Sequence, residues 1–163
     1  MAKGFIFRRI RGRLIPIRTS LSKGNLPNTS KLSVTSLGKD GGATGRLFVS
    51  ITKGKSANLD AVQVYKSFRN KGLSSRLFKK AAQFLRRTTD VKFLRGNDIV
   101  NAAQIKIRSK HKSKFIASGL GHFGEGSKIV SAKEAIRLLK KSNDPSNLFN
   151  TTIKASTRIR KNG

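Results

Sequence analysis

A turn near the middle of the chain carries the residues best suited to bind a phosphate group. Its sequence is Arg69-Asn70-Lys71-Gly72-Leu73-Ser74, between a predicted strand and a predicted amphipathic helix. The first turn of a helix presents backbone N–H groups without intrahelical partners, and the helix dipole adds positive partial charge there. A strand, a basic turn and a helix in this order therefore predict an anion site.

The whole chain is strongly basic. Its 163 residues include 36 Lys and Arg but only 7 Asp and Glu, for a formal net charge of +29 at pH 7. Lysine and arginine near phosphates release condensed counterions, so nucleic acid is the expected partner, ahead of an anionic membrane or a merely solvated basic surface. The expected contacts, to phosphates rather than to bases, are Arg8, Arg9, Arg11, Arg13, Lys79, Lys80, Arg86, Arg87, Arg158, Arg160 and Lys161.

Several kinds of site and segment are not expected. The chain has no cysteine, and its two histidines, His111 and His122, do not have zinc-ligand spacing, so no metal site is predicted. No apolar run approaches the length of a membrane span, and the N-terminus lacks the apolar stretch of a secretory signal. We therefore expect synthesis in the cytoplasm and no membrane partner.

The elements that must position the turn follow from hydrophobic periodicity. Residues 46–52 and 59–65 alternate and predict an antiparallel hairpin, and residues 70–87 predict the helix. Further predicted elements are a strand at 91–94, a helix from Asp98 to about Lys110, a strand at 115–117, and a helix from Ser131 through Lys141 that begins with a Ser131–Glu134 capping box. Core periodicity assigns Phe68, Phe78, Phe84, Phe93 and Phe115 to the interior.

Composition divides the chain into four parts. Residues 1–18 alternate basic and apolar residues and predict a short strand or extended arm that docks on another surface. Residues 19–43 are rich in Ser, Thr, Asn, Gly and Pro and predict a linker or meandering loop. Residues 44–142 form the predicted core, and residues 143–163 a basic C-terminal tail.

The core resembles the GNAT acetyltransferases. The strand and turn that carry the resemblance read Val64, Phe68, Arg69, Gly72, Leu73 and Ser74, followed by Leu77. The resemblance implies an α+β fold with a mixed, mainly antiparallel sheet flanked by helices. It also implies that backbone amides of Arg69, Asn70, Lys71, Gly72, Leu73 and Ser74 would grip the pyrophosphate of acetyl-CoA.

The catalytic half of the resemblance is incomplete. Members of the family need a base and an acid for two proton transfers. Asp60 is placed to be the base, although it could instead simply pair with a nearby lysine. The expected tyrosine acid falls near Arg108, whereas the only tyrosine is Tyr65, and Ser74 replaces a glycine of the cofactor turn. The surplus of positive charge would also repel a cationic acceptor.

The N-terminal segment Gly4–Ile17 resembles small basic virion proteins of tailed bacteriophages. Together with the charge and the incomplete catalytic set, this favours a structural, non-catalytic role near the portal, neck or packaged DNA, with no cofactor. Such a protein would be made in the host cytoplasm and located in the virion, in contact with nucleic acid and neighbouring subunits. Two alternatives remain open: an acetyl-CoA-dependent N-acetyltransferase and a ribosome-associated protein.

Overall fold

The computed structural model describes residues 4–10, 13–96, 99–120, 124–144 and 151–160. The chain divides into two compact units. The first comprises Met1–Leu94 with Ile159–Gly163, and the second comprises Arg95–Arg158. No helix in the described part of the chain is long and apolar enough to cross a membrane.

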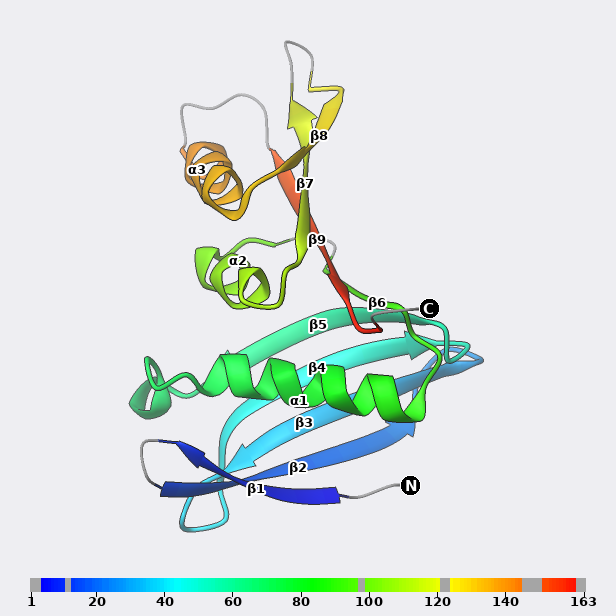
Figure 1. The fold of residues 1–163 in the computed structure, drawn as a ribbon, viewed down its shortest axis with the longest axis vertical. Helices are drawn as coiled ribbons and strands as arrows, with labels where there is room; N and C mark the ends of the chain where they lie inside the picture. The colour runs from blue at the N-terminus through cyan, green and yellow to red at the C-terminus, as the bar shows by residue number, and fades with distance from the viewer. Residues whose placement is uncertain (1–3, 11–12, 97–98, 121–123, 145–150, 161–163) are drawn as a thin grey trace. The chain divides into compact units, whose positions relative to one another are not determined.

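The first unit is built on an antiparallel meander (Figure 1). Its strands, adjacent in chain order, are β1 (Gly4–Ile10), β2 (Arg13–Lys23), β3 (Thr29–Leu37), β4 (Ala43–Thr52) and β5 (Ser56–Val64). After β5 come a short 3₁₀ helix, η1 (Lys66–Phe68), and the long helix α1 (Leu73–Thr88), which lies across one face of the sheet. The predicted docking arm is thus the outer hairpin of this sheet, with β1 at its edge.

The strands bury one side of their alternating side chains beneath α1. Leu47, Val49 and Ile51 of β4 are buried, whereas the residues between them point to the opposite face. Gly45 of β4 permits the close approach of the helix, because a Cβ there would lie 3.2 Å from Leu73 Cδ2. The helix begins later than predicted because Asn70 and Gly72 adopt positive φ angles of 61° and 75°.

The predicted linker over residues 19–43 is wrong in its local structure, because β3 and the end of β2 occupy most of it. Some of its hydroxyl side chains, those of Thr19, Thr35 and Ser36, are buried. Ser36 and Thr44 are buried with their hydroxyl oxygens 2.8 Å apart, and Ser36 Oγ also donates to the Gly45 carbonyl at 3.3 Å. Paired hydroxyl groups can be buried at little cost, so a Ser- and Thr-rich sequence can still form a core strand.

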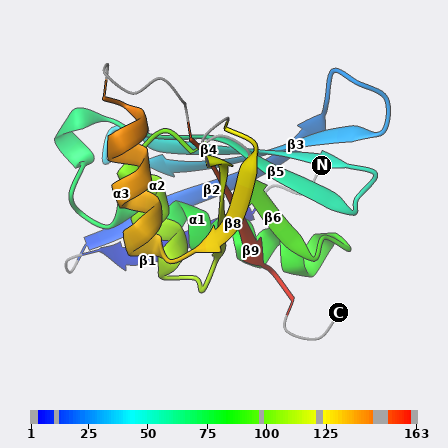
Figure 2. The same cartoon turned by 90° about the horizontal axis from the view of Figure 1, so that it is seen from above.

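The second unit combines a smaller antiparallel sheet with two helices. Its elements are the end of β6 (Phe93–Gly96), α2 (Ala102–Ser109), β7 (Lys114–Leu120), β8 (Gly126–Val130), α3 (Ala132–Ser142) and β9 (Thr152–Arg158). Strand β7 pairs antiparallel with both β8 and β9. Helices α2 and α3 lie side by side in both views (Figures 1 and 2).

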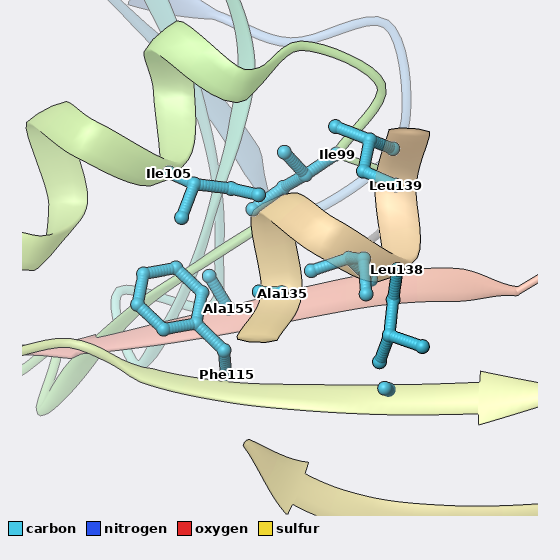
Figure 3. Close-up of a cluster of buried hydrophobic side chains, with 9 residues drawn as sticks. Ile99, Ile105, Phe115, Ala135, Leu138, Leu139 and Ala155 are labelled. Carbon is cyan, nitrogen blue, oxygen red and sulfur yellow. The ribbon is translucent and has the colours of Figure 1, made fainter. Parts of the chain in front are cut away.

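The interior of the second unit is formed mainly by both helices and by strands β7 and β9 (Figure 3). Ile105 of α2, Leu138 and Leu139 of α3, Phe115 of β7 and Ala155 of β9 meet in one apolar cluster. The predicted C-terminal tail is therefore wrong over β9, whose alternate residues are buried. Apolar burial of this kind contributes about 25 cal/mol per Å², which fixes the strand in place.

The fold class predicted from the sequence is confirmed as a mixed, mainly antiparallel sheet flanked by helices. Ser131 Oγ accepts a hydrogen bond from the Glu134 N–H at 3.1 Å and begins α3 as predicted. Asp98 lies outside the described residues, and Asn101 caps α2 instead, accepting from the Ala103 N–H at 2.8 Å. Phe93 was predicted to be core, but its side chain is exposed.

Candidate functional site

The predicted anion-binding turn lies between β5 and α1. Its backbone reverses through Asn70 and Gly72, both in the left-handed region. Arg69 fixes the end of β5, because its Nε donates to the Val64 carbonyl at 2.9 Å. Apart from its chain neighbours, no described residue has an atom within 4 Å of the position that a Cβ on Gly72 would take, so the turn is open on that side.

The first amides of α1 are available to a ligand. No side chain caps this helix and its first turn holds no acid, whereas Asn101 and Ser131 cap α2 and α3. The Arg76 N–H donates to the Gly72 carbonyl at 3.3 Å. In the described part of the chain, the N–H groups of Leu73, Ser74 and Ser75 have no hydrogen-bond acceptor. These donors and the helix dipole together favour an anion.

Aromatic and basic side chains surround the turn. Tyr65 is 46% exposed and Phe68 is 37% exposed, and the Lys71 ammonium lies 5.7 Å from the centre of the Phe68 ring. The prediction that Phe68 belongs to the core is wrong, because η1 buries none of its residues. The site is thus a cationic, partly aromatic surface rather than a closed pocket.

Asp60, the predicted base, lies apart from these amides. It is the extra residue of a β-bulge, since Phe48 pairs with Ala61 and Val49 with Leu59. Its carboxylate accepts hydrogen bonds from Ser50 Oγ and, at 3.2 Å, from Asn58 Nδ2. Because Ser50 alternates with the buried residues of β4, these bonds form on the face of the sheet that α1 does not cover.

Arg108 stands where the family resemblance places a tyrosine, and it serves the interior of the second unit. Its side chain is 1% exposed, and its Nη1 donates to Thr157 Oγ1 at 2.8 Å. Ser113 joins the network, with its Oγ 2.6 Å from Thr157 Oγ1 and 2.7 Å from the Arg108 carbonyl. Burial lowers the pKa of Arg108 to about 10. An arginine so enclosed is a structural group.

The residues predicted to contact nucleic acid differ in their exposure. Lys79, Arg86 and Arg87 of α1 and Arg158 of β9 are exposed, as expected for phosphate contacts. Lys80 is only 7% exposed, so that prediction is corrected: the helix turns it toward the sheet. Arg8 and Arg9 lie in β1 and Arg13 begins β2, whereas Arg11 and Lys161 lie outside the described residues.

Arg160 has a structural role that the sequence did not indicate. Its Nη2 donates to the Arg86 carbonyl at 3.3 Å and to the Thr89 carbonyl, and it lies 3.9 Å from an Asp90 carboxylate oxygen. A cation at the last carbonyls of a helix stabilises the negative end of its dipole. Arg160 therefore caps the C-terminus of α1 from the end of the chain.

Three exposed cations were missed by the sequence analysis. Arg18, Lys31 and Arg46 lie on β2, β3 and β4, at alternating positions that face away from α1. Their signal was the two-residue period of these strands, which was recognised in β4 but was concealed in β2 and β3 by the high Ser and Thr content.

This chain is similar to known proteins in its fold but not in its sequence. No family model matches it, and no curated protein matches its sequence. Solved structures do. An IAA acetyltransferase from Bacillus cereus superposes with a TM-score of 0.56 at 11% identity, over 88% of this chain and 99% of that protein. An acetyltransferase of the GNAT family from Streptococcus pneumoniae gives 0.52 at 12% identity, over 82% and 69%.

The ribosomal-protein-S18-alanine N-acetyltransferase from Escherichia coli gives a TM-score of 0.54 at 13% identity, over 82% of this chain and 72% of that protein. The chain has the GNAT fold. The resemblance seen in the strand and turn of residues 64–77 is thus confirmed at the level of the fold. In this GNAT fold, the uncapped amides of α1 follow β5, η1 and the basic turn, and Asp60 lies on the face of the sheet opposite α1.

Proposed function

We propose that this protein is a non-catalytic GNAT-fold component of a nucleic-acid-containing assembly, where it binds phosphate backbone. One observation carries the proposal. If each of the 7 acids neutralised one of the 36 cations, 36 − 7 = 29 positive charges would still remain. A surplus of this size opposes the compact state unless a polyanion compensates it. Exposed Lys79, Arg86 and Arg87 on α1 offer one surface for that contact.

The state of the catalytic groups supports a non-catalytic role. Asp60 is held by two side-chain donors on the face opposite α1, so it does not stand beside the amides expected to hold an acyl donor. Arg108 is enclosed in its own hydrogen-bond network. Tyr65 is exposed at the turn itself. These positions supply no matched base and acid next to one another.

The finer part of the proposal concerns the assembly. The segment Gly4–Ile17, which resembles small virion proteins of tailed phages, supports a position near the portal, neck or packaged DNA. The outer hairpin of β1 and β2 offers a sheet edge to a neighbouring subunit. A ribosome-associated protein would share the charge, and copurification with capsids or with ribosomes chooses between the two.

Nucleic-acid binding is tested by measuring affinity for a random-sequence oligonucleotide as a function of salt. Binding should weaken steeply between about 50 and 200 mM salt, because each phosphate contact contributes about 0.7 to 0.9 to the logarithmic slope. Substituting Lys79, Arg86 and Arg87 with glutamine should lower both affinity and slope. Binding that does not respond to salt would contradict the proposal.

A second candidate, binding of acetyl-CoA, is favoured by the uncapped amides of Leu73, Ser74 and Ser75 beside the open side of Gly72. These amides fit a pyrophosphate, and the cofactor would supply an acetyl thioester for transfer to an amine. Calorimetric titration should detect binding, and Gly72→Val should abolish it by straining the positive φ. Absence of binding at about millimolar ligand eliminates this candidate.

A further inference from the structure

The sheet of the first unit has two faces, and α1 covers only one of them. Among the described residues of that unit, no helix lies on the other face. We call it the open sheet face: the side of β2–β5 opposite α1. The contact between Leu73 and Gly45 places α1 on one side, so residues out of phase with Gly45 form the other. Arg18, Thr35 and Arg46 share this face, paired in one row across three strands.

The cations of the open sheet face are spaced across it. Arg18 and Arg46 are both exposed and flank Thr35, two strands apart, which separates their Cα atoms by about 10 Å. Lys31 is exposed at the other end of the face, where it pairs with Ser50 in the strand register. A polyanion lying over these strands could contact all three charges.

An aromatic ring lies between these cations. Phe48 pairs with Ser33, which pairs in turn with Ser20, so the ring stands in a row of small hydroxyl side chains. The Lys31 ammonium lies 4.8 Å from the centre of this ring. Such a contact is worth only about 0.5–1 kcal/mol at an exposed site, so a stacking base can displace the lysine.

Negative charge is scarce on this face. Asp60 is the only acid in β2–β5, and Ser50 and Asn58 already donate hydrogen bonds to its carboxylate. The face therefore has three cations against one acid, next to an aromatic ring and several hydroxyl donors.

We propose that the open sheet face binds single-stranded nucleic acid. Arg18, Lys31 and Arg46 contact phosphates, and Phe48 stacks on a base. The inference rests on the proposed function and deepens it by naming the surface and the form of the partner. Duplex grooves are read by projecting helices or ribbons, whereas sheet faces with aromatic and basic residues accept splayed bases of single strands. In the first unit the long helix, α1, lies on the other face.

The test uses two variants of the whole chain with the same change in charge. One carries Arg18→Gln, Lys31→Gln and Arg46→Gln; the control carries Lys79→Gln, Arg86→Gln and Arg87→Gln on α1. Affinities are measured for a labelled single strand and for the duplex of the same sequence. The sheet variant should lose at least about tenfold more affinity for the single strand than the control loses. Equal losses in the two variants would overturn the inference.

Substitutions of Phe48 test the stacking contact separately, because they do not change the charge of the protein. Phe48→Leu should weaken single-strand binding by about fivefold to a hundredfold while duplex binding stays unchanged, and Phe48→Tyr should restore it. A leucine variant that binds single strands normally contradicts the inference. If the unmodified chain binds neither nucleic acid at low salt, the proposed function itself fails. If the sheet variant keeps the full salt-dependent binding of the unmodified chain, the proposed function is supported. In that case only the assignment of binding to the open sheet face is contradicted.

Discussion

The packing of Arg108 depends on the absence of a side chain at Gly96. Gly96 lies against the guanidinium of Arg108, since a Cβ on Gly96 would be 2.7 Å from Arg108 Nη2. The glycine leaves space for the guanidinium, whose Nη1 donates to Thr157. Arg108, near the position where the family resemblance places a tyrosine acid, is thus a buried packing group in the structure.

This arrangement predicts an energetic coupling. Gly96→Ala should lower the free energy of unfolding by about 1–3 kcal/mol, because the added methyl group displaces a buried side chain. In an Arg108→Leu background, where Thr157 keeps its partner Ser113, the same change should cost at least about 1 kcal/mol less. Denaturant titration of the four proteins measures the difference. Equal costs in both backgrounds would show that the close approach is not the cause.

At the scale of elements, each helix end is stabilised in a different way. Side chains cap the N-termini of α2 and α3, Arg160 caps the C-terminus of α1, and no side chain caps the N-terminus of α1. In α3 the second half of the capping box takes another partner, because the Glu134 carboxylate accepts from Arg137 Nε at 2.8 Å and Nη2 at 2.6 Å.

The Glu134–Arg137 pair predicts an acid-dependent stability of α3. The hydrogen bond from Arg137 lowers the pKa of Glu134 below its ordinary 4.5. The pair therefore stabilises the folded state fully above pH 4.5, and this contribution is lost as the pH falls through the lower, folded-state pKa. The melting temperature of Glu134→Gln should lie below that of the unmodified protein at pH 6, and this gap should close toward pH 3.

Glu125→Gln serves as the control for Glu134→Gln, since it removes one exposed carboxylate and changes the net charge equally. The gap for Glu134→Gln at pH 6 should exceed that for Glu125→Gln. Identical gaps at every pH would assign the effect to net charge rather than to the ion pair.

At the scale of the whole molecule, charge is the dominant property. A net charge of +29 on 163 residues makes the folded chain repel itself, and mobile ions screen that repulsion with a Debye length of about 10 Å at 0.1 M salt. The GNAT fold by itself says nothing of this, because one fold supports many functions.

The thermal midpoint of the free protein should therefore rise as sodium chloride increases from about 20 to 300 mM, since screening relieves repulsion in the folded state. A short oligonucleotide at low salt should raise the midpoint further, because binding to the folded state stabilises it. Differential scanning calorimetry measures both shifts. A midpoint that falls with added salt would show that attractive ion pairs, and not repulsion, govern stability.

Features that depend on neighbours along the chain could be predicted from the sequence. The basic turn before α1, the hairpin of β4 and β5 and the Ser131 cap of α3 follow from local backbone and side-chain chemistry, and the structure confirms them. The turn residues that match the family pattern indicated the GNAT fold for the same reason.

Features that depend on contacts between distant residues could not be predicted from the sequence. Ser36 and Thr44 can be buried because their hydroxyl groups lie within hydrogen-bonding distance of each other between β3 and β4. Composition alone had predicted a loop at Ser36. Strand β9 enters the core because Phe115 and Ala155 meet on one sheet face, and Arg160 caps α1 only because the chain returns there. Contacts between residues that are distant in the sequence form only in the folded chain. The alternation of residues within one polar strand therefore could not predict which of them are buried or paired.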